Sequence, residues 1–454
     1  MFKDKKIIVV GIARSGISTL KALKEVSAYV IINDMKTKEN LAEILPQIDG
    51  LYNEAILGEH PDDYSGVDIM VLSPGVPTDL EFINKARKSG VEVIGELELA
   101  YRLSNSKKFI GITGTNGKTT TTALVGKMFE DFGSPSYVVG NIGIPAVSVA
   151  LTNKKQDFMI TEVSSFQLET ISKFKTDVSA VLNLTPDHLN RHKTMENYID
   201  AKARIFENQI EGDILILNYD NELTRKLKFR TDKSRVVFFS RNIELEDGAY
   251  VSESKLMIKD KLSGLTHEVI DVNDIFIPGP HNLENAMAAS LIAFYSGISI
   301  ESIKSSLMSF KGVEHRLEYV DLINEIKYYN DSKGTNPDSS IVAVKSMNGP
   351  TVLIAGGMDK ASEFDGLIDS FGDTVVELVL FGETKFIIEK CAHRKGFKHT
   401  HIVNSLEEAI KKASTVNYKT KNILLSPACA SWDMYENYEK RGEEFKKLVN
   451  SLRG

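Results

Sequence analysis

The stretch FIGITGTNGKTT, residues 109–120, joins an apolar run typical of a buried strand to the start of a predicted helix. Its glycines let backbone N–H groups surround phosphate oxygens, and a helix N-terminus adds positive potential. Lys118 would reach the β- and γ-phosphates, and the Thr119 hydroxyl would ligate Mg²⁺. The general GxxxxGK[ST] pattern fails by one place, because residue 112 is Ile and the glycine is Gly114. The sequence therefore predicts a variant phosphate loop, with an ordinary glycine-rich turn as the alternative.

Apolar strand-like runs alternate with helical patterns on both sides of this loop, which is typical of α/β layering. A chain of 454 residues is too long for one ordinary core. We expect three α/β domains, residues 1–105, 106–311 and 312–454, the outer two Rossmann-like and the central one like a P-loop ATPase. The expected strands are 6–10, 28–33, 68–73, 109–113, 158–162, 178–184, 213–218, 235–240, 351–355, 375–381, 400–403 and 422–426, with a hairpin of 317–323 and 326–331. The expected helices are 15–24, one beginning near 119, 281–296 and 300–310.

Composition excludes several classes of function. A net charge of -7, with 55 basic and 62 acidic residues, provides no basic surface for nucleic acid. The two cysteines, Cys391 and Cys429, have no metal-like spacing and suit a reducing compartment. No apolar stretch approaches the ~18 residues that span a bilayer, and the N-terminal apolar run is too short for a signal peptide. We expect a soluble, cytoplasmic, monomeric protein with small-molecule partners.

A second glycine turn, residues 11–16, follows the first predicted strand, and Asp34 ends the second strand. This arrangement resembles the dinucleotide fingerprint, in which an acid binds the ribose. The middle glycine is replaced by Ala13, however, which would crowd a pyrophosphate. Helix–strand packing is one alternative role for the turn. An NAD(P)-dependent oxidoreductase is a competing class, but it leaves Lys118 unexplained.

Glu162 and His188 come at or just after the ends of consecutive predicted strands that follow the phosphate loop. A carboxylate beside such a loop is well placed to hold Mg²⁺, and His188 could be a second ligand. In isolation, a strand-end Glu is usually solvated and a lone His is usually structural. Their occurrence together after the same loop favours a metal site.

The C-terminal third adds lysines in loops at strand ends, at Lys333 within 330–336 and at Lys360 within 356–360. They suggest a surface that binds anions, with solvated turns as the alternative. Lys202 lies in a predicted helix capped by Thr194. From spacing alone it reads as a solvated helix lysine.

Together these segments resemble the Mur ligase family of peptidoglycan synthesis, in order and over essentially the whole chain. The motifs that carry the resemblance are GTNGKTT at 114–120, EVSSFQLE at 162–169, DHLNRH at 187–192, AKARIF at 201–206, HNLENAMAA at 281–289, EHRLE at 314–318, NDSKGTN at 330–336 and SPACASWDMYENYEKRG at 426–442. The short N-terminus, the SPACASWD segment and the lack of an Asp-Asn-Pro-Arg motif favour the D-glutamate-adding branch.

The resemblance implies an ADP-forming amide ligase that activates UDP-N-acetylmuramoyl-L-alanine as an acyl phosphate and joins it to D-glutamate. A sister Mur ligase or a folate polyglutamylating enzyme is the alternative. The resemblance also implies ATP, two Mg²⁺ ions and a CO₂-derived carbamate on Lys202. It implies a UDP-sugar, not NAD, in the first domain, and this ligand is compatible with Ala13.

Site residues follow from the same resemblance. Catalytic roles fall on Lys118, His188 and Lys202, and metal binding falls on Thr119, Glu162, His188 and Lys202. ATP is expected at Gly114, Thr115, Asn116, Gly117, Lys118, Thr119, Thr120, Asn141, Asn282, Asn285, Arg316 and Asp331. The UDP-sugar is expected at Arg14, Ser15, Asp34, Ser73, Gly75, Asn141, Ser164, Gln167 and His188. D-glutamate is expected at Lys333, Thr335, Lys360, Ser431, Trp432 and Tyr438. Arg14 and Trp432 depart from the family's familiar forms.

Overall fold

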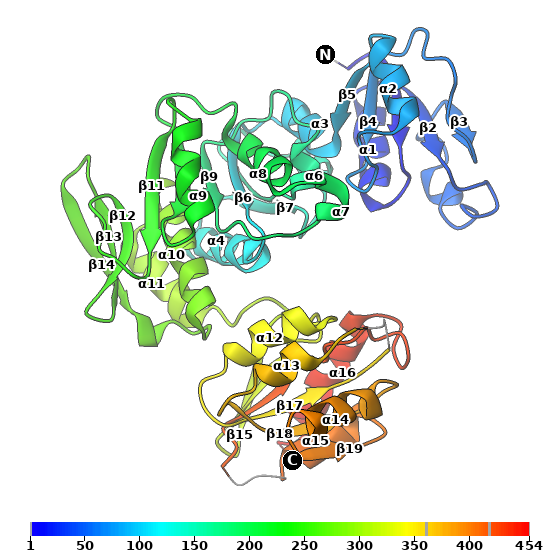
Figure 1. Cartoon of the computed structure of the whole chain (residues 1–454). Coiled ribbons are helices and arrows are strands. Elements are labelled where there is room, and N and C mark those ends of the chain that lie inside the picture. The colour runs from blue at the N-terminus through cyan, green and yellow to red at the C-terminus, as the bar shows by residue number, and fades with distance from the viewer. Residues whose placement is uncertain (1, 359–361, 416–418, 454) are drawn as a thin grey trace. The chain divides into compact units, whose positions relative to one another are not determined.

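The computed structural model describes residues 2–358, 362–415 and 419–453 (Figure 1). The chain forms two compact units, Met1–Asp274 with Glu284–Ser306 and Ile275–Leu283 with Leu307–Gly454. The described strands make three separate sheets, two in the first unit and one in the second. The predicted α/β class is thus confirmed, with one sheet for each expected domain. The domain boundaries at 105 and 311 stay a prediction.

The N-terminal sheet is wholly parallel in the order β3-β2-β1-β4-β5. Its strands are β1 (Lys6–Val10), β2 (Tyr29–Asp34), β3 (Glu54–Leu57), β4 (Ile69–Leu72) and β5 (Glu92–Gly95). Its helices are α1 (Arg14–Glu25), α2 (Glu81–Lys88) and α3 (Glu96–Leu103). The strand order reverses between β1 and β4, and ligands of such sheets bind outside the carboxyl ends at that point. Ser73 after β4 donates from Oγ to the carbonyl oxygen of Gly11 after β1 at 2.8 Å.

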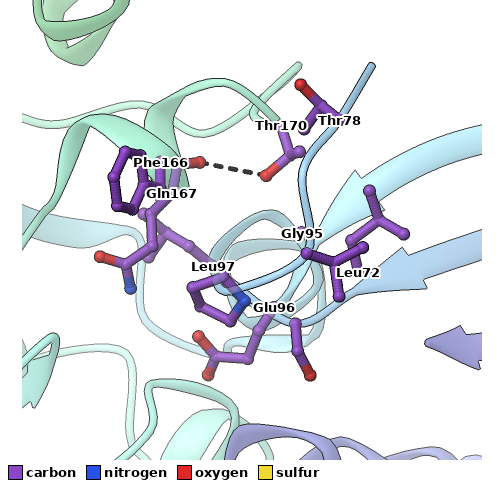
Figure 2. A pocket seen from close by; sticks show the side chains of 11 residues that line it. Leu72, Thr78, Gly95, Glu96, Leu97, Phe166, Gln167 and Thr170 are labelled. Atoms are coloured by element: carbon purple, nitrogen blue, oxygen red, sulfur yellow. Dashed lines mark hydrogen bonds between the residues drawn. The ribbon is translucent and has the colours of Figure 1, made fainter. Parts of the chain in front are cut away.

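A pocket opens where this carboxyl edge meets α6 (Ser165–Leu168), as Figure 2 shows. Its lining combines the loop after β4 with the start of α3 and with α6. The lining residues are Leu72, Ser73, Pro74, Val76, Thr78, Gly95, Glu96, Leu97, Phe166, Gln167 and Thr170. Two of them, Ser73 and Gln167, belong to the residues expected to hold the UDP-sugar.

The central sheet has the order β14-β13-β12-β11-β10-β9-β6-β8-β7. Its parallel strands are β6 (Lys108–Thr113), β7 (Ser136–Gly140), β8 (Phe158–Glu162), β9 (Val178–Val181), β10 (Ile214–Asn218), β11 (Arg235–Ser240) and β12 (Gly248–Ser252). An antiparallel ribbon of β12, β13 (Lys255–Asp260) and β14 (Leu265–Asp271) extends one side. The phosphate loop leads from β6, in the interior of this sheet, to α4 (Lys118–Phe132).

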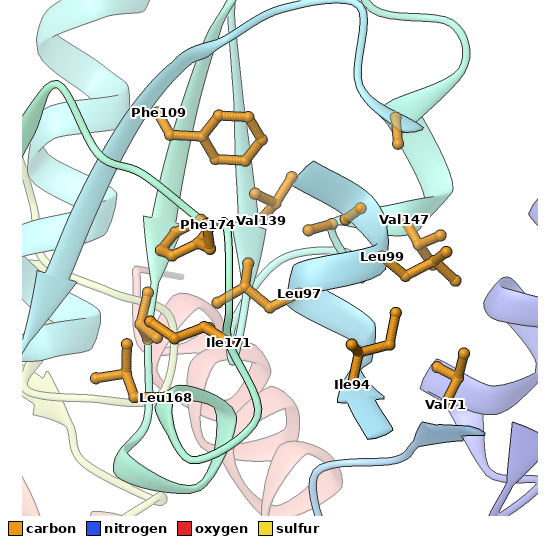
Figure 3. Packing of buried hydrophobic residues seen from close by; sticks show 14 of the residues in the cluster. Val71, Ile94, Leu97, Leu99, Phe109, Val139, Val147, Leu168, Ile171 and Phe174 are labelled. Carbon is orange, nitrogen blue, oxygen red and sulfur yellow. The ribbon is translucent and has the colours of Figure 1, made fainter. Parts of the chain in front are cut away.

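The first two sheets share one hydrophobic core. Leu97 and Leu99 of α3 are buried in the same cluster as Val147 and Phe174 of the central domain, as Figure 3 shows. Burying such apolar side chains contributes roughly 1.5–3 kcal/mol each. The glycine turn of the first sheet and the phosphate loop of the second sheet therefore belong to one compact unit with a common core.

The C-terminal sheet has the order β15-β16-β20-β17-β18-β19, and it opens with the predicted hairpin. Its strands are β15 (Glu318–Ile323), β16 (Ile326–Asn330), β17 (Thr351–Ala355), β18 (Val375–Leu380), β19 (Thr400–Ile402) and β20 (Asn422–Leu425). Its helices are α12 (Pro337–Lys345), α13 (Asp365–Asp369), α14 (Lys385–Arg394), α15 (Leu406–Ala413) and α16 (Tyr438–Ser451). Two buried clusters form its core, one containing Leu353 and the other Ile354. Within the described residues, no helix is both long and apolar enough to cross a membrane.

Candidate active site

The phosphate loop closes tightly around its glycines. Gly117, at the start of α4, has a φ of +85°, and a Cβ there would lie 2.2 Å from Oδ1 of Asn285 in α10 (Pro280–Tyr295). The left-handed conformation therefore favours glycine at residue 117, and a side chain there would have to displace the Asn285 amide. Lys118 extends back over the loop and donates from Nζ to the carbonyl oxygens of Gly114 and Thr115, at 2.9 and 2.8 Å.

Asn183 supports the other side of the loop. Its Oδ1 accepts from the backbone N–H of Asn116 at 2.8 Å, and its Nδ2 donates to the carbonyl oxygen of Asn116 at 3.0 Å. The backbone N–H of Thr115 donates to the carbonyl oxygen of Asn183 at 2.9 Å. Sequence reasoning assigned no role to Asn183. The available signal was its position near the end of a predicted strand, the same signal that singled out Glu162.

Lys202 is buried, with 2% of its surface exposed, so the reading from spacing alone as a solvated helix lysine is wrong. It lies on α8 (Met195–Ala203), which buries Tyr198 on the same side. Its Nζ donates to the carbonyl oxygen of Gly114 at 2.8 Å and to Oγ1 of Thr113 at 3.3 Å, and lies 4.9 Å from the Tyr198 ring centroid. Burial, followed by the charge of Lys118, holds the pKa of the Lys202 ammonium well below its usual value.

Glu162 ends β8 with 1% of its surface exposed. Its Oε1 accepts from Nδ2 of Asn141 at 2.7 Å, whereas its Oε2 is buried without a hydrogen-bond partner. Leaving a buried carboxylate oxygen unsatisfied is costly. A cation in contact with Oε2 would remove that cost, so this carboxylate fits a metal ligand.

His188 adopts a left-handed conformation, with a φ of 52°, at the start of α7 (Leu189–His192). Its side chain is about half exposed, its Nε2 lies 3.5 Å from Oδ2 of Asp187, and its ring centroid lies 4.9 Å from that of Phe166. Across the described parts of the chain, no three His, Cys, Asp or Glu side chains gather closely enough to hold a metal. A metal there would need further oxygen ligands, and Thr119 in the first turn of α4 carries a hydroxyl.

The residues expected to bind the UDP-sugar lie around the first glycine turn. Asp34 accepts from the backbone N–H of Ile12 at 2.9 Å and from that of Lys36 at 3.0 Å, so it shapes the turn itself. Arg14 and Ser15 begin α1, and Gly75 lies in the loop after β4. Ser164 and Gln167 form a capping box at the start of α6.

In the second unit, the Asp331 carboxyl is buried beneath the loop after β16. It accepts from Oγ of Ser426 at 2.7 Å and from the backbone N–H of Leu317 at 3.2 Å. Burial raises the pKa of Asp331 to about 7, against the opposing effect of the Ser426 hydrogen bond and the Arg316 charge. Asn282 donates from Nδ2 to the carbonyl oxygen of Pro278 at 2.7 Å. The residues expected to hold ATP are thus divided between the two units.

The loops expected to hold D-glutamate are tied together by Arg441, which sequence reasoning missed. This guanidinium is fully buried on α16 and donates to the Ser332 hydroxyl at 3.0 Å, the Ser332 carbonyl at 2.8 Å and the Cys429 carbonyl at 3.2 Å. Lys333 and Thr335 follow Ser332, and Ser431 and Trp432 follow Cys429. Lys333 Nζ lies 5.9 Å from the Tyr438 ring centroid. Lys360 lies outside the described residues.

Comparison with known proteins accounts for nearly the whole chain. Residues 5–95 match the "Mur ligase MurD-like, N-terminal domain" model, residues 112–293 the "Mur ligase middle domain" and residues 315–429 the "Mur ligase, glutamate ligase domain". A protein of Clostridioides difficile (strain 630) named UDP-N-acetylmuramoylalanine--D-glutamate ligase is 49% identical over 454 residues, which are 99% of each chain. The chain belongs to the Mur ligase family.

Solved Mur ligase structures share the fold. The UDP-N-acetylmuramate-alanine ligase of Thermotoga maritima is 20% identical, with a TM-score of 0.57 over 98% of this chain and 99% of that one. A MurF structure from Acinetobacter baumannii is 15% identical, with a TM-score of 0.60 over 92% and 91% of the two chains. Mur ligases generally use ATP and Mg²⁺. The phosphate loop and the unpartnered oxygen of Glu162 fit that requirement.

Proposed function

We propose that this Mur ligase is the ADP-forming enzyme that adds D-glutamate to UDP-N-acetylmuramoyl-L-alanine, a cytoplasmic step of peptidoglycan synthesis. The observation that carries the proposal is identity of 47 to 49% over almost the full length to relatives that share one name, UDP-N-acetylmuramoylalanine--D-glutamate ligase. The phosphate loop and the buried Lys202 beside it support phosphoryl transfer at this site. In this role the protein acts in the cytoplasm as a monomer, and its partners are its small-molecule substrates.

The reaction must turn a carboxylate oxygen into a leaving group, because a carboxylate and an amine in water form a salt and not an amide. The alanyl carboxylate attacks the γ-phosphorus of ATP, a P–O bond forms, and the bond to ADP breaks. The D-glutamate amine then attacks the carbonyl carbon of the acyl phosphate. The tetrahedral intermediate expels inorganic phosphate, and the amine loses its proton to leave the amide.

Both partners of the first step are anions, so positive charge is the main catalytic requirement. Lys118 contacts the β- and γ-phosphates, and the backbone N–H groups of residues 114–120 surround them. Thr119, Glu162 and His188 hold Mg²⁺. When bound, Mg²⁺ screens the phosphate oxygens from the incoming carboxylate. Exclusion of water from the site protects the acyl phosphate.

Lys202 carries a carboxylate derived from CO₂ in the working enzyme. Its Nζ forms an N–C bond to CO₂ and releases a proton, which changes a cation into an anionic oxygen ligand. Only a neutral amine can react in this way, and burial beside Lys118 favours the neutral amine. The modified side chain, Thr119, Glu162 and His188 would then supply oxygen and nitrogen ligands for two Mg²⁺ ions.

The remaining ligand-binding residues are assigned domain by domain. The UDP-sugar binds at the glycine turn of the first sheet and at α6. Asn141, Asn282, Asn285, Arg316 and Asp331 complete the ATP site. Lys333 and Lys360 meet the two carboxylates of D-glutamate, and Thr335, Ser431, Trp432 and Tyr438 line the same position.

The decisive experiment measures phosphate release from ATP by the purified protein with each candidate acceptor and amine. We expect release only when UDP-N-acetylmuramoyl-L-alanine and D-glutamate are both present, with L-glutamate, lysine and diaminopimelate poor substitutes. Preference for diaminopimelate would identify a sister Mur ligase, and preference for a folate would identify a polyglutamylating enzyme. Hydride transfer to NAD(P) without ATP hydrolysis would instead identify an oxidoreductase.

A further inference from the structure

The loop between β7 and α5 (Val147–Ala150) is held at three points by side chains from elsewhere in the first unit. Asn141 donates from Nδ2 to Oε1 of Glu162 at 2.7 Å. Arg14 donates from Nη2 to the carbonyl oxygen of Gly143 at 2.7 Å. The backbone N–H of Val147 donates to Oε1 of Glu96 at 2.7 Å. One loop thus contacts the expected metal ligand at one end and the N-terminal domain at its middle and far end.

Backbone hydrogen bonds hold the turn between these contacts. Gly140 donates from its backbone N–H to the carbonyl oxygen of Ile144 at 3.0 Å, and Asn141 donates in the same way to Glu162 at 3.0 Å. Gly143 has a φ of +70°, and a Cβ there would lie 2.4 Å from the carbonyl oxygen of Val138. Residue 143 must therefore be a glycine, and the two backbone hydrogen bonds fix the start of the turn. A displacement of the Gly143 carbonyl should move the Asn141 side chain with it.

Arg14 contacts the β7–α5 loop from the N-terminal domain, whereas Asn141 of this loop contacts Glu162. Arg14 is the first residue of α1 and directly follows the glycine turn that begins at Gly11. A guanidinium has five N–H donors in a planar fork, and the bond to Gly143 uses Nη2 of an otherwise exposed side chain. An anion bound at this turn would meet the N-terminus of α1 and the remaining Arg14 donors together.

We propose that Arg14 is a positioning residue that couples the nucleotide-sugar at the glycine turn to Glu162 through the β7–α5 loop. The inference rests on the proposed function for the identity of the nucleotide-sugar. Binding of its diphosphate orients Arg14, Arg14 fixes Gly143, and the loop then holds Asn141 against the Glu162 carboxylate. Coupling of this kind is reciprocal. The nucleotide-sugar should therefore tighten Mg²⁺ binding, and Mg²⁺ should tighten nucleotide-sugar binding by the same factor.

The first test is calorimetric and needs no turnover. UDP-N-acetylmuramoyl-L-alanine is titrated into the full-length protein with and without Mg²⁺, for wild type, Arg14→Met and Lys21→Met. Lys21 is an exposed lysine of the same helix and serves as the matched control. We expect Mg²⁺ to tighten binding about five- to tenfold in wild type and in Lys21→Met, which is the net size of one ordinary hydrogen bond. In Arg14→Met we expect the ratio of the Kd without Mg²⁺ to the Kd with Mg²⁺ to fall to about one.

The second test uses turnover to separate positioning from simple contact. In Arg14→Met, the Mg²⁺ concentration at half-maximal rate and the KM for the nucleotide-sugar should both rise about five- to tenfold, while the KM for D-glutamate stays unchanged. Arg14→Lys should restore part of both effects. The change in Mg²⁺ requirement should not add to that of Asn141→Ala, because both variants break the same connection.

Two results would overturn the coupling. One is a raised KM for the nucleotide-sugar with an unchanged Mg²⁺ requirement, since Arg14 would then be a contact only. The other is a Mg²⁺ ratio in the calorimetric titration that Arg14→Met leaves intact. A wild-type protein that binds the nucleotide-sugar but releases no phosphate with D-glutamate would refute the proposed reaction. The calorimetric ratio would still decide the coupling in that case.

Discussion

Lys118 and Lys202 donate to the same atom, the carbonyl oxygen of Gly114, at 2.9 and 2.8 Å. Two ammonium groups on one acceptor repel each other, and only Lys202 is buried. The repulsion therefore adds to desolvation in depressing the pKa of Lys202. The arrangement places a partly exposed lysine and a buried lysine at one point of the phosphate loop, which suits the roles proposed for Lys118 toward phosphate and for Lys202 toward CO₂.

Lys118→Ala should abolish ADP formation, with a loss of roughly 10³-fold or more, because it removes the positive charge that we propose for the transferring phosphate. Circular dichroism should show a folded protein. Lys127→Ala is the matched control on the same helix, since Lys127 forms only local ion pairs with Glu130 and Asp131. Near-normal turnover of Lys118→Ala would remove the phosphate-loop assignment.

Lys202→Ala should lose most of the activity, and acetate should restore part of it by filling the vacated ligand position. Lys202→Arg should also fail, because it keeps the positive charge but cannot form a carbamate. The modification itself is detectable by NMR after exchange with ¹³C-bicarbonate, as a signal that is absent from both variants. A fully active Lys202→Arg would contradict the carbamate.

Glu162→Gln should lose activity without losing stability. The variant keeps an acceptor for Asn141 and replaces the unpartnered, charged carboxylate oxygen with an uncharged amide group. In thermal unfolding, Mg²⁺ with a non-hydrolysable ATP analogue should raise the Tm of wild type more than that of the variant. Equal shifts would mean that Glu162 does not hold the metal.

Glu96 predicts a pH dependence of stability. Burial raises the pKa of this carboxyl to about 7, against hydrogen bonds from the backbone of Val147 and Ala146. Between about pH 4.5 and pH 7 the unfolded chain ionises and the folded chain does not, so stability should fall as the pH rises, by up to about 3 kcal/mol, and then level off. Glu96→Gln cannot titrate, so its advantage in Tm over wild type should grow from pH 5 to pH 7. An advantage that is the same at every pH would refute the shift.

Trp432 is the single tryptophan of the chain, and it is 63% exposed in the loop that follows β20. D-glutamate bound beside it should change its fluorescence, and L-glutamate should have little effect. Arg441→Met should weaken the D-glutamate response, because Arg441 joins this loop to the Ser332 loop. Lys440→Met, an exposed neighbour paired with Glu443, is the control. A response to both enantiomers alike would argue against a stereospecific site here.

Sequence reasoning succeeded where local pattern determines structure. The predicted strands 6–10, 158–162 and 235–240 coincide with β1, β8 and β11, because continuous β-branched and aromatic runs are bounded by polar or turn residues. The antiparallel ribbon of β12, β13 and β14 was missed, because the apolar run inside β13, residues 256–258, is only three residues long and is flanked by Lys255 and Lys259.

In the candidate site, too, features encoded by local sequence were predicted and features that depend on long-range contacts were not. Glycines and strand-end carboxylates can be read from a linear pattern, and so Gly117 and Glu162 were singled out. The burial of Lys202 depends on Gly114 and Thr113, about 90 positions away, and no helical spacing encodes it. The bonds from Arg441 to Ser332 likewise join residues that are 109 positions apart. Long-range contacts of this kind arise only from the folded topology.

The shared core beneath α3 has a consequence for biogenesis on the ribosome. The first sheet ends with β5, yet the buried face of α3 lies against Val147 and Phe174, which are synthesised dozens of residues later (Figure 3). A nascent chain that has emerged only as far as Leu103 carries a helix whose apolar face still lacks its partners from the central domain. We expect that intermediate to bind holding chaperones, and to be released once the strand after Phe174 has emerged.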